Sequence, residues 1–170
     1  MNLRSALITF PLATFACLAS AATDEVKLIA TDDAQMQAAK ATARRTLDQF
    51  LAIHDKPPFD ATNMEVKVVF SHQGYDELMW VAPFRRTTSG FQGILKNQPR
   101  DIPGLQWGQQ VTFTKAEIVD WGYAQRGKTY GHFTTCVLFE RQPSPEVSAA
   151  RRDRGYVCDR SGSQIRPVKQ

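Results

Sequence analysis

Three histidines are the side chains in this sequence that could exchange protons near neutral pH. His54 falls at the end of a helical pattern and His72 in a turn, where neither has an obvious chemical partner. His132 follows a glycine in an apolar segment and is expected across from Asp120 or Tyr123. It is therefore the candidate for acid–base chemistry, although a hydrogen-bonded structural histidine is the commoner role at such a position.

The patterns that accompany catalysis or metal binding are missing from the sequence. There is no Gly-x-Ser-x-Gly motif and no pair of closely spaced histidines or cysteines. Asp76 and Glu77 are adjacent, so on a strand they point to opposite faces and cannot act as a carboxylate pair. We therefore predict no catalytic residue, metal or cofactor.

Tryptophans are the more informative residues. Trp80 lies in a strand pattern and is expected in the core, whereas Trp107 lies in a loop rich in proline and glycine. Tryptophan in a loop is typical of contact surfaces. Trp107 is therefore a candidate binding residue, and the full candidate set is Trp107, Trp121, Asp120, His132 and Tyr123.

Residues 1–21 are predicted to be a cleavable signal peptide. Arg4 supplies the positive start, residues 6–18 are apolar, and small residues ending at Ala21 form the cleavage site. A membrane-spanning helix would need about 20 apolar residues, and this run is shorter and contains Pro11. The mature protein is expected in the periplasm or outside the cell.

Export determines how the cysteines are interpreted. Cys136 and Cys158 are expected to form a disulfide in an oxidising compartment, with two free thiols as the alternative. Acylation of Cys17 is not expected, because Thr14 and Phe15 do not fit a lipoprotein signal. No later stretch is apolar enough to span a membrane, and a net charge of +4 is too weak to indicate nucleic acid as a partner.

The coarse fold follows from hydrophobic periodicity. Apolar residues at three- and four-residue steps predict an amphipathic helix over residues 32–54, with Asp32 and Gln35 as a capping box. Alternating or short apolar runs predict the strands, which fall at residues 64–70, 77–83, 91–95, 109–114 and about 130–139. The sum is an α+β fold: one N-terminal amphipathic helix on a curved antiparallel sheet of five to six strands, open or closed into a small barrel.

The expected organisation is a signal peptide at 1–21, an α+β domain at 22–140 and a basic C-terminal tail at 141–170. The tail is polar enough to fray, and the disulfide would pin it to the last strand.

Several short segments match a known pattern in order and spacing. They are the helix at 32–50, Glu-Leu-Met-Trp-Val at 77–81, Gly-Phe-Gln-Gly-Ile-Leu at 90–95, Ile-Val-Asp-Trp at 118–121 and Gly-His-Phe-Thr at 131–134. Together they resemble the domain of unknown function 2314 family, the YegJ-like bacterial proteins. The resemblance implies a binding role without a defined activity, and the cysteine pair and basic tail do not belong to the family pattern.

The functional expectation is an exported binding or inhibitor-type protein without catalytic activity, whose partner is another protein of the cell envelope. Its most specific form is an immunity protein against a toxin that acts in the periplasm. The alternatives are a small envelope hydrolase, or a ligand carrier with an aromatic pocket near His132 and Asp120.

Overall fold

The computed structural model describes residues 33–163, and the predicted signal peptide and the last seven residues lie outside that range. Helix α1 (Ala34–Asp55) begins at Asp33, whose carboxylate accepts the Met36 N–H at 2.9 Å. Asp33 is thus the observed cap, while the cap predicted from sequence, Asp32, lies outside the described residues. Pro57 and Pro58 follow the end of the helix and cannot extend it.

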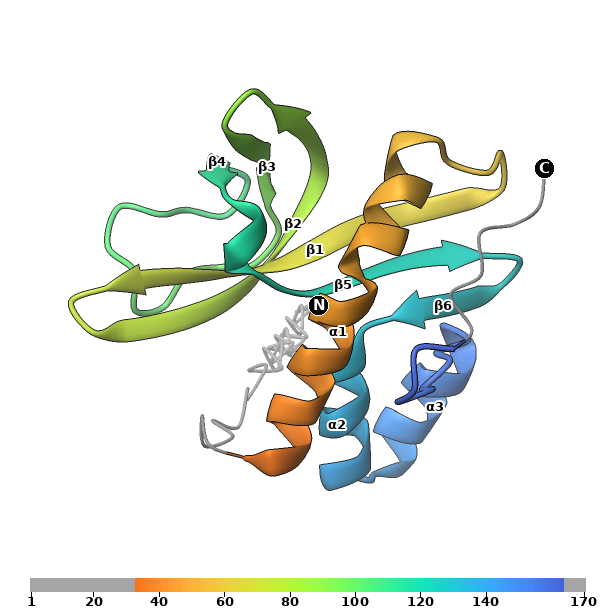
Figure 1. Cartoon of the computed structure of the whole chain (residues 1–170). Coiled ribbons are helices and arrows are strands. Elements are labelled where there is room, and N and C mark those ends of the chain that lie inside the picture. Colours follow the sequence, from red (N-terminus) through yellow and green to blue (C-terminus); the bar gives the residue numbers. More distant parts are fainter. Residues whose placement is uncertain (1–32, 164–170) are drawn as a thin grey trace, which may run out of the picture.

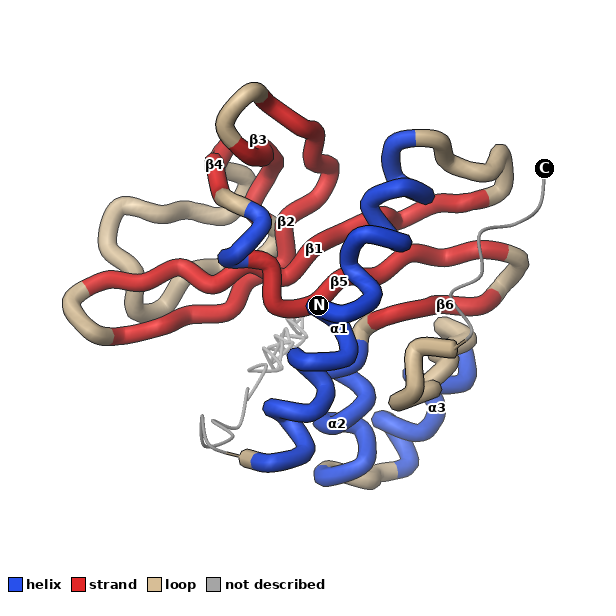
Figure 2. Tube along the Cα trace, viewed as in Figure 1, coloured by secondary structure: helices blue, strands red, loops and turns tan. Residues whose placement is uncertain are grey.

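Six strands form one antiparallel sheet (Figures 1 and 2). They are β1 (Ala61–His72), β2 (Tyr75–Thr87), β3 (Gly90–Leu95), β4 (Gln110–Phe113), β5 (Ile118–Gln125) and β6 (Lys128–Gly131). A short 3-10 turn, η1 (Lys115–Glu117), joins β4 to β5. The strand order is β4-β3-β2-β1-β5-β6, so the sheet is open, with β4 and β6 at its edges. The predicted α+β fold is confirmed.

Helix α1 covers one face of the curved sheet, and the core lies between them (Figure 1). Trp121 on β5 is fully buried there, and its indole Nε1 donates to the Ala43 carbonyl at 3.0 Å. Phe50 of α1 stacks on the same indole, with ring centroids 4.8 Å apart. The apolar face of α1 and the inward side chains of β1, β2 and β5 therefore bury each other, as their periodicities require.

The prediction of a last strand at 130–139 is wrong. Strand β6 ends at Gly131, and helix α2 (Phe133–Arg141) begins two residues later. Gly131 and His132 both have positive φ, 77° and 53°, which ends the extended backbone. The segment Phe-Thr-Thr-Cys-Val-Leu-Phe-Glu is rich in β-branched and aromatic residues, so composition favoured a strand where tertiary contacts dictate a helix.

As far as residue 163, the C-terminal segment folds back onto the domain instead of fraying. Helix α3 (Pro145–Asp153) is capped by Ser144, and residues 155–157 then run beside β6, with a parallel bridge between Thr129 and Tyr156. The disulfide between Cys136 and Cys158 joins this segment to α2, not to a strand. In Figure 1 the N-terminal half of α1 lies beside α2 and α3 below the sheet, and its C-terminal half crosses the sheet face. No helix within residues 33–163 is long and apolar enough to cross a bilayer.

Candidate functional site

A buried polar cluster lies where β1, β5 and the start of α2 meet, on the sheet face opposite α1. Lys67 and Asp120 are cross-strand partners on β1 and β5. The Lys67 ammonium donates to the Thr134 hydroxyl at 2.8 Å, and that hydroxyl donates to Asp120 Oδ2 at 2.6 Å. All three side chains are buried. The Thr134 hydroxyl therefore bridges the Lys67 ammonium and the Asp120 carboxylate by hydrogen bonds, away from water.

Asp120 also caps helix α2 from outside the helix. Its Oδ2 accepts the Thr134 N–H at 2.8 Å, and its Oδ1 accepts those of Phe133 at 3.2 Å and Trp121 at 2.8 Å. The N–H groups of Phe133 and Thr134 belong to the positive end of the α2 dipole, which favours a carboxylate, whereas that of Trp121 belongs to β5. Burial raises the pKa of Asp120, while Lys67 and the hydrogen bonds act against that shift. Both carboxylate oxygens are thus engaged in structural bonds.

Burial also acts on the other charged members of the cluster. It lowers the pKa of Lys67, against the attraction of Asp120 and Glu65, and it raises the pKa of Glu65. The Lys67 ammonium sits 4.7 Å from the centroid of the Trp80 ring. A partly buried tryptophan face therefore replaces some of the water that the ammonium has lost.

His132 packs beside this cluster, with its ring in contact with two other aromatic rings. Its ring lies 4.6 Å from Trp80 and 5.2 Å from Tyr156, and its Nε2 is 3.6 Å from Glu65 Oε1. Only 5% of the residue is exposed. Burial, followed by the charges of Lys67 and Arg154, lowers the pKa of His132 to about 3, so the imidazole is neutral at pH 7.

The room for His132 comes from Gly122 on β5. A Cβ at Gly122 would lie 2.0 Å from the imidazole Nε2, far inside van der Waals contact. The imidazole of His132 therefore packs directly against the backbone of Gly122, which has no side chain.

The five candidate residues chosen from sequence fall in three separate places. Asp120 and His132 share the face opposite α1, where they are buried. Trp121 and Tyr123 point the other way into the core beneath α1, stacked on each other at 6.3 Å. Trp107 lies in the loop before β4 and is 64% exposed. The set is therefore not one site.

Sequence reasoning missed Lys67, Thr134 and Trp80 as partners of the cluster. Lys67 is a polar position in an alternating strand, which normally faces water. It is buried because the first turn of α2 covers it, and that turn was predicted as a strand. No local pattern marks the contact, since Lys67 and Thr134 lie 67 residues apart.

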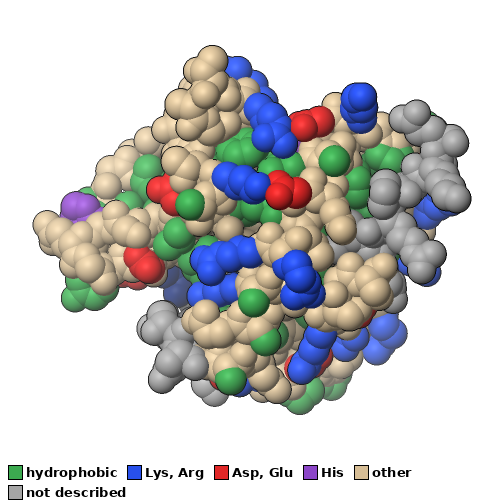
Figure 3. Space-filling model, viewed as in Figure 1, with side chains coloured by type: hydrophobic (Ala, Val, Ile, Leu, Met, Phe, Trp, Pro, Cys, Tyr) green, Lys and Arg blue, Asp and Glu red, His purple; other side chains and the backbone are tan. Residues whose placement is uncertain are grey.

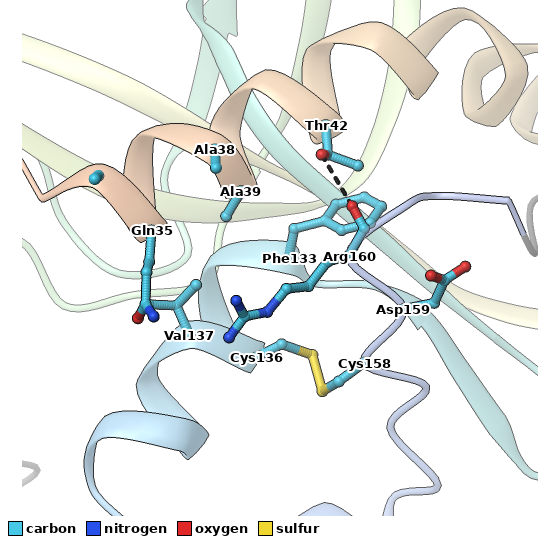
Figure 4. A pocket seen from close by; sticks show the side chains of 11 residues that line it. Gln35, Ala38, Ala39, Thr42, Phe133, Cys136, Val137, Cys158, Asp159 and Arg160 are labelled. Carbon is cyan, nitrogen blue, oxygen red and sulfur yellow. Dashed lines mark hydrogen bonds between the residues drawn. A yellow bond between two sulfur atoms is a disulfide. The ribbon is translucent and has the colours of Figure 1, made fainter.

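An apolar cavity of about 220 Å³ lies elsewhere, between α1, α2 and the C-terminal segment (Figure 4). Ala38 and Ala39 form one wall, Phe133 and Val137 another, and the disulfide closes the third side. Thr42 donates to the Arg160 carbonyl at 3.1 Å and holds the segment over the cavity. Within residues 33–163, no three His, Cys, Asp or Glu side chains are placed to hold a metal ion together.

Trp107 stands at one end of a loop that is tied down at several points. Glu77 of β2 accepts the backbone N–H of Arg100 at 3.0 Å and of Asp101 at 3.1 Å. The Asn97 side chain accepts the Trp80 N–H, and Gly108 donates to the Leu95 carbonyl at 2.9 Å. The loop therefore presents the exposed Trp107 from a fixed backbone.

A second exposed aromatic residue lies at the same end of the molecule. Tyr75 begins β2 at the tip of the β1–β2 hairpin and is 68% exposed. Figure 1 shows this hairpin tip and the 96–109 loop projecting on the same side, away from α3.

The protein is an α+β protein with an open six-stranded antiparallel sheet, a long helix on one sheet face and two short helices after the last strand. Residues 33–154 match the model of the family described as an uncharacterized protein conserved in bacteria (DUF2314), and the chain belongs to that family. The resemblance seen in the sequence is thereby confirmed.

A curated relative is "Uncharacterized protein YegJ" of Escherichia coli (strain K12). It is 28% identical over 109 residues, which cover 64% of this chain and 70% of the relative. No solved structure matched the chain.

Proposed function

We propose that this protein is an exported binding or inhibitor-type protein without catalytic activity, which acts on another protein of the cell envelope. The observation that carries the proposal is Trp107, 64% exposed on a loop whose backbone is fixed by Glu77 and Asn97. Tryptophan is enriched among residues that dominate binding energy, and a fixed loop loses little entropy on association.

The geometry around His132 and Asp120 supports binding over the hydrolase alternative. A general base for work near neutral pH needs a pKa close to 7, whereas burial lowers the pKa of His132 to about 3. Asp120 already accepts bonds from Thr134, Phe133 and Trp121, so it is committed to holding α2. Glu77, the other carboxylate considered, binds loop N–H groups.

The ligand-carrier alternative expected an aromatic pocket near His132 and Asp120. The aromatic rings around His132 instead fill the space, with Trp80 and Tyr156 in direct ring contact with it. The cavity of about 220 Å³ lies elsewhere, and Phe133 is the one aromatic residue among those that line it. These observations also support an outward-facing binding surface.

The most specific form of the proposal is an immunity protein that neutralises a toxin acting in the periplasm. It combines the predicted signal peptide, the small size of the chain and the exposed Trp107. An inhibitor of this kind needs no catalytic group, only a surface complementary to its target.

The test is an affinity pull-down from periplasmic extract with the tagged mature protein. Wild type should retain one stoichiometric protein, and Trp107→Ala should weaken its binding at least about thirtyfold, as expected for loss of ~2 kcal/mol at a dominant contact. Phe59→Ala is the matched control, because Phe59 is equally aromatic, fully exposed, and on the α1–β1 connection. A wild-type pull-down without a stoichiometric partner would contradict the proposal.

A further inference from the structure

The cavity between α1, α2 and the C-terminal segment has a buried floor and an open mouth (Figure 4). Ala39, Phe133 and Val137 are buried and form the floor. Ala34 and Ala38, which line the cavity from the first turns of α1, are exposed. The cavity therefore opens to solvent beside the start of α1, which is where the chain enters the described domain.

The lining of the cavity indicates an aliphatic occupant. Each polar side chain in the lining is already bonded within the protein: Thr42 to the Arg160 carbonyl, Arg160 to Glu140, Asp159 to Ser161, and Gln35 to Arg141. A polar ligand would have to displace one of these bonds, whereas an aliphatic side chain needs none. An apolar cavity of about 150 Å³ accommodates benzene. The volume here, about 220 Å³, therefore has room for two branched aliphatic side chains.

Suitable side chains lie in the chain just before α1. Residues 22–32, which begin the predicted mature chain, read Ala-Thr-Asp-Glu-Val-Lys-Leu-Ile-Ala-Thr-Asp and include Leu28 and Ile29. Leu28 comes six residues before Ala34, and an extended chain spans about 3.3–3.6 Å per residue, so Leu28 can reach roughly 20 Å from the start of α1. The α1 residues that line the cavity, Ala34 to Thr42, extend over only about 12 Å of helix. The segment is therefore long enough to reach every part of the mouth.

Charge favours this segment over the other end of the chain. The first turns of α1, residues 34–47, carry Lys40, Arg44 and Arg45 and no acidic residue. Figure 3 shows Lys and Arg side chains spread over α1 and the neighbouring helices. Residues 22–32 contain three acidic residues and one lysine, whereas residues 164–170 contain two basic residues and no acidic one. A segment that lies along α1 is therefore attracted if it comes from the N-terminal end and repelled if it comes from the C-terminal end.

We propose that residues 22–32 fold back along the first turns of α1 and bury Leu28 and Ile29 in this cavity. The aliphatic side chains leave water and fill an apolar space that α1, α2 and the disulfide already enclose on three sides. The start of the predicted mature chain is then part of the folded domain, and the cavity is an internal docking site for it. This proposal concerns a surface separate from Trp107 and does not rest on the proposed function.

The first test is nuclear Overhauser spectroscopy of the methyl-labelled mature protein, residues 22–170. The methyl groups of Leu28 and Ile29 should show contacts to those of Ala38 and Val137. Ala38→Phe places a ring in the mouth of the cavity and should abolish these contacts. Ala41→Phe is the matched control, because Ala41 is exposed on the same helix and does not line the cavity, and it should leave the contacts intact. A folded wild type without these contacts would overturn the proposal.

The second test asks whether the cavity is filled in solution. Dissolved xenon enters empty apolar cavities. It should leave the Val137 methyl signals of wild type unshifted and should shift them in the double variant Leu28→Ser/Ile29→Ser. The same variant should lower the urea midpoint of unfolding by at least about 0.5 M, since it loses the apolar contacts of the segment. Ile165→Ser/Val168→Ser makes the equivalent change near the C-terminus and should behave as wild type does in both measurements.

Three further outcomes would assign the cavity differently and overturn the proposal. A xenon-dependent shift of Val137 in wild type would show that the cavity is open to a free apolar ligand. Opening of the cavity by Ile165→Ser/Val168→Ser, and not by Leu28→Ser/Ile29→Ser, would make the C-terminal residues the occupant. Methyl contacts that appear only between differently labelled molecules in a mixed sample would make a second copy the occupant.

Discussion

Asp120 on β5 holds the first turn of α2 through Thr134, because its Oδ2 accepts both the backbone N–H and the hydroxyl of that residue. The hydroxyl in turn accepts a hydrogen bond from Lys67 on β1. One carboxylate therefore joins two strands to a helix that composition alone would have made a strand. These hydrogen bonds from the first turn of α2 to Asp120 explain why the chain leaves the sheet at His132.

Asp120→Asn should destabilise the protein by about 3 kcal/mol, because the buried Lys67 ammonium loses the larger of its two counter-charges and keeps only Glu65. It also turns an amide NH₂ toward N–H groups that need an acceptor. The measurement is equilibrium unfolding in urea at pH 7. Asp48→Asn, which breaks an exposed pair with Lys115, is the control and should cost less than about 1 kcal/mol. Equal losses in the two variants would contradict the role assigned to Asp120.

Gly122→Ala should destabilise by about 1–3 kcal/mol, since the new Cβ would overlap the His132 ring, which Trp80 and Tyr156 hold in place. His132→Gly is the second single variant of a double-mutant cycle. It removes the imidazole ring, and glycine tolerates the positive φ of that position. In the His132→Gly background, Gly122→Ala should lower the free energy of unfolding by at least about 1 kcal/mol less than it does in wild type. Strictly additive losses in urea unfolding would show that the clash is not with His132.

The pH dependence of stability should carry a contribution from His132. Its pKa is about 3 in the folded protein and near its ordinary 6.5 in the unfolded chain, so the unfolded chain binds the proton first as pH falls. This contribution is fully present above pH 6.5 and is lost as pH falls toward 3. Between pH 6.5 and 5 the loss should be about 2 kcal/mol.

His132→Gln has no titrating ring and should flatten that part of the stability profile. Glu65, whose pKa burial raises, remains in both proteins and carries an opposite pH dependence. Urea unfolding at several pH values between 7 and 4.5 measures the effect. Parallel profiles for wild type and His132→Gln would mean that the imidazole is not excluded from water in solution.

Much of the sheet and the first helix could be predicted from sequence, because each has a periodicity set by one buried face. Helix α1 and the strand at 64–70 are examples, with Phe50 and Val68 inward as the spacing requires. Helix α2 could not be predicted in this way. Its start depends on Asp120, which lies on another element, and its first five residues, 133–137, have low helical propensity.

The candidate site was harder to predict than the fold for the same reason. Asp120 and Trp121 are neighbours in sequence, but alternation along β5 sends them to opposite faces of the sheet. Trp107 was predicted as a contact residue from its loop composition, and the structure leaves it exposed. The partner Lys67 is known only from the register of β1 against β5.

Replacing Cys136 and Cys158 together by serine should lower stability by about 3 kcal/mol, since the bond closes a loop with a sequence separation of 22. The loss should be uneven across the molecule. Beyond α3, the segment is otherwise held by its bridge to Thr129 and by bonds such as that from Thr42 to Arg160. We therefore expect the Val157 amide to exchange much faster with solvent, while buried amides of β1 such as Val68 follow only the change in global stability.

Hydrogen–deuterium exchange of the double serine variant against wild type measures this difference. Thr42→Val serves as the matched control, because it removes one side-chain bond to the same segment and leaves the disulfide in place. It should accelerate exchange near Arg160 and leave Val157 close to its wild-type rate, since Val157 bonds to Thr129 independently. Protection of Val157 that survives loss of the disulfide would mean that pairing with β6, rather than the covalent bond, keeps this edge of the sheet closed.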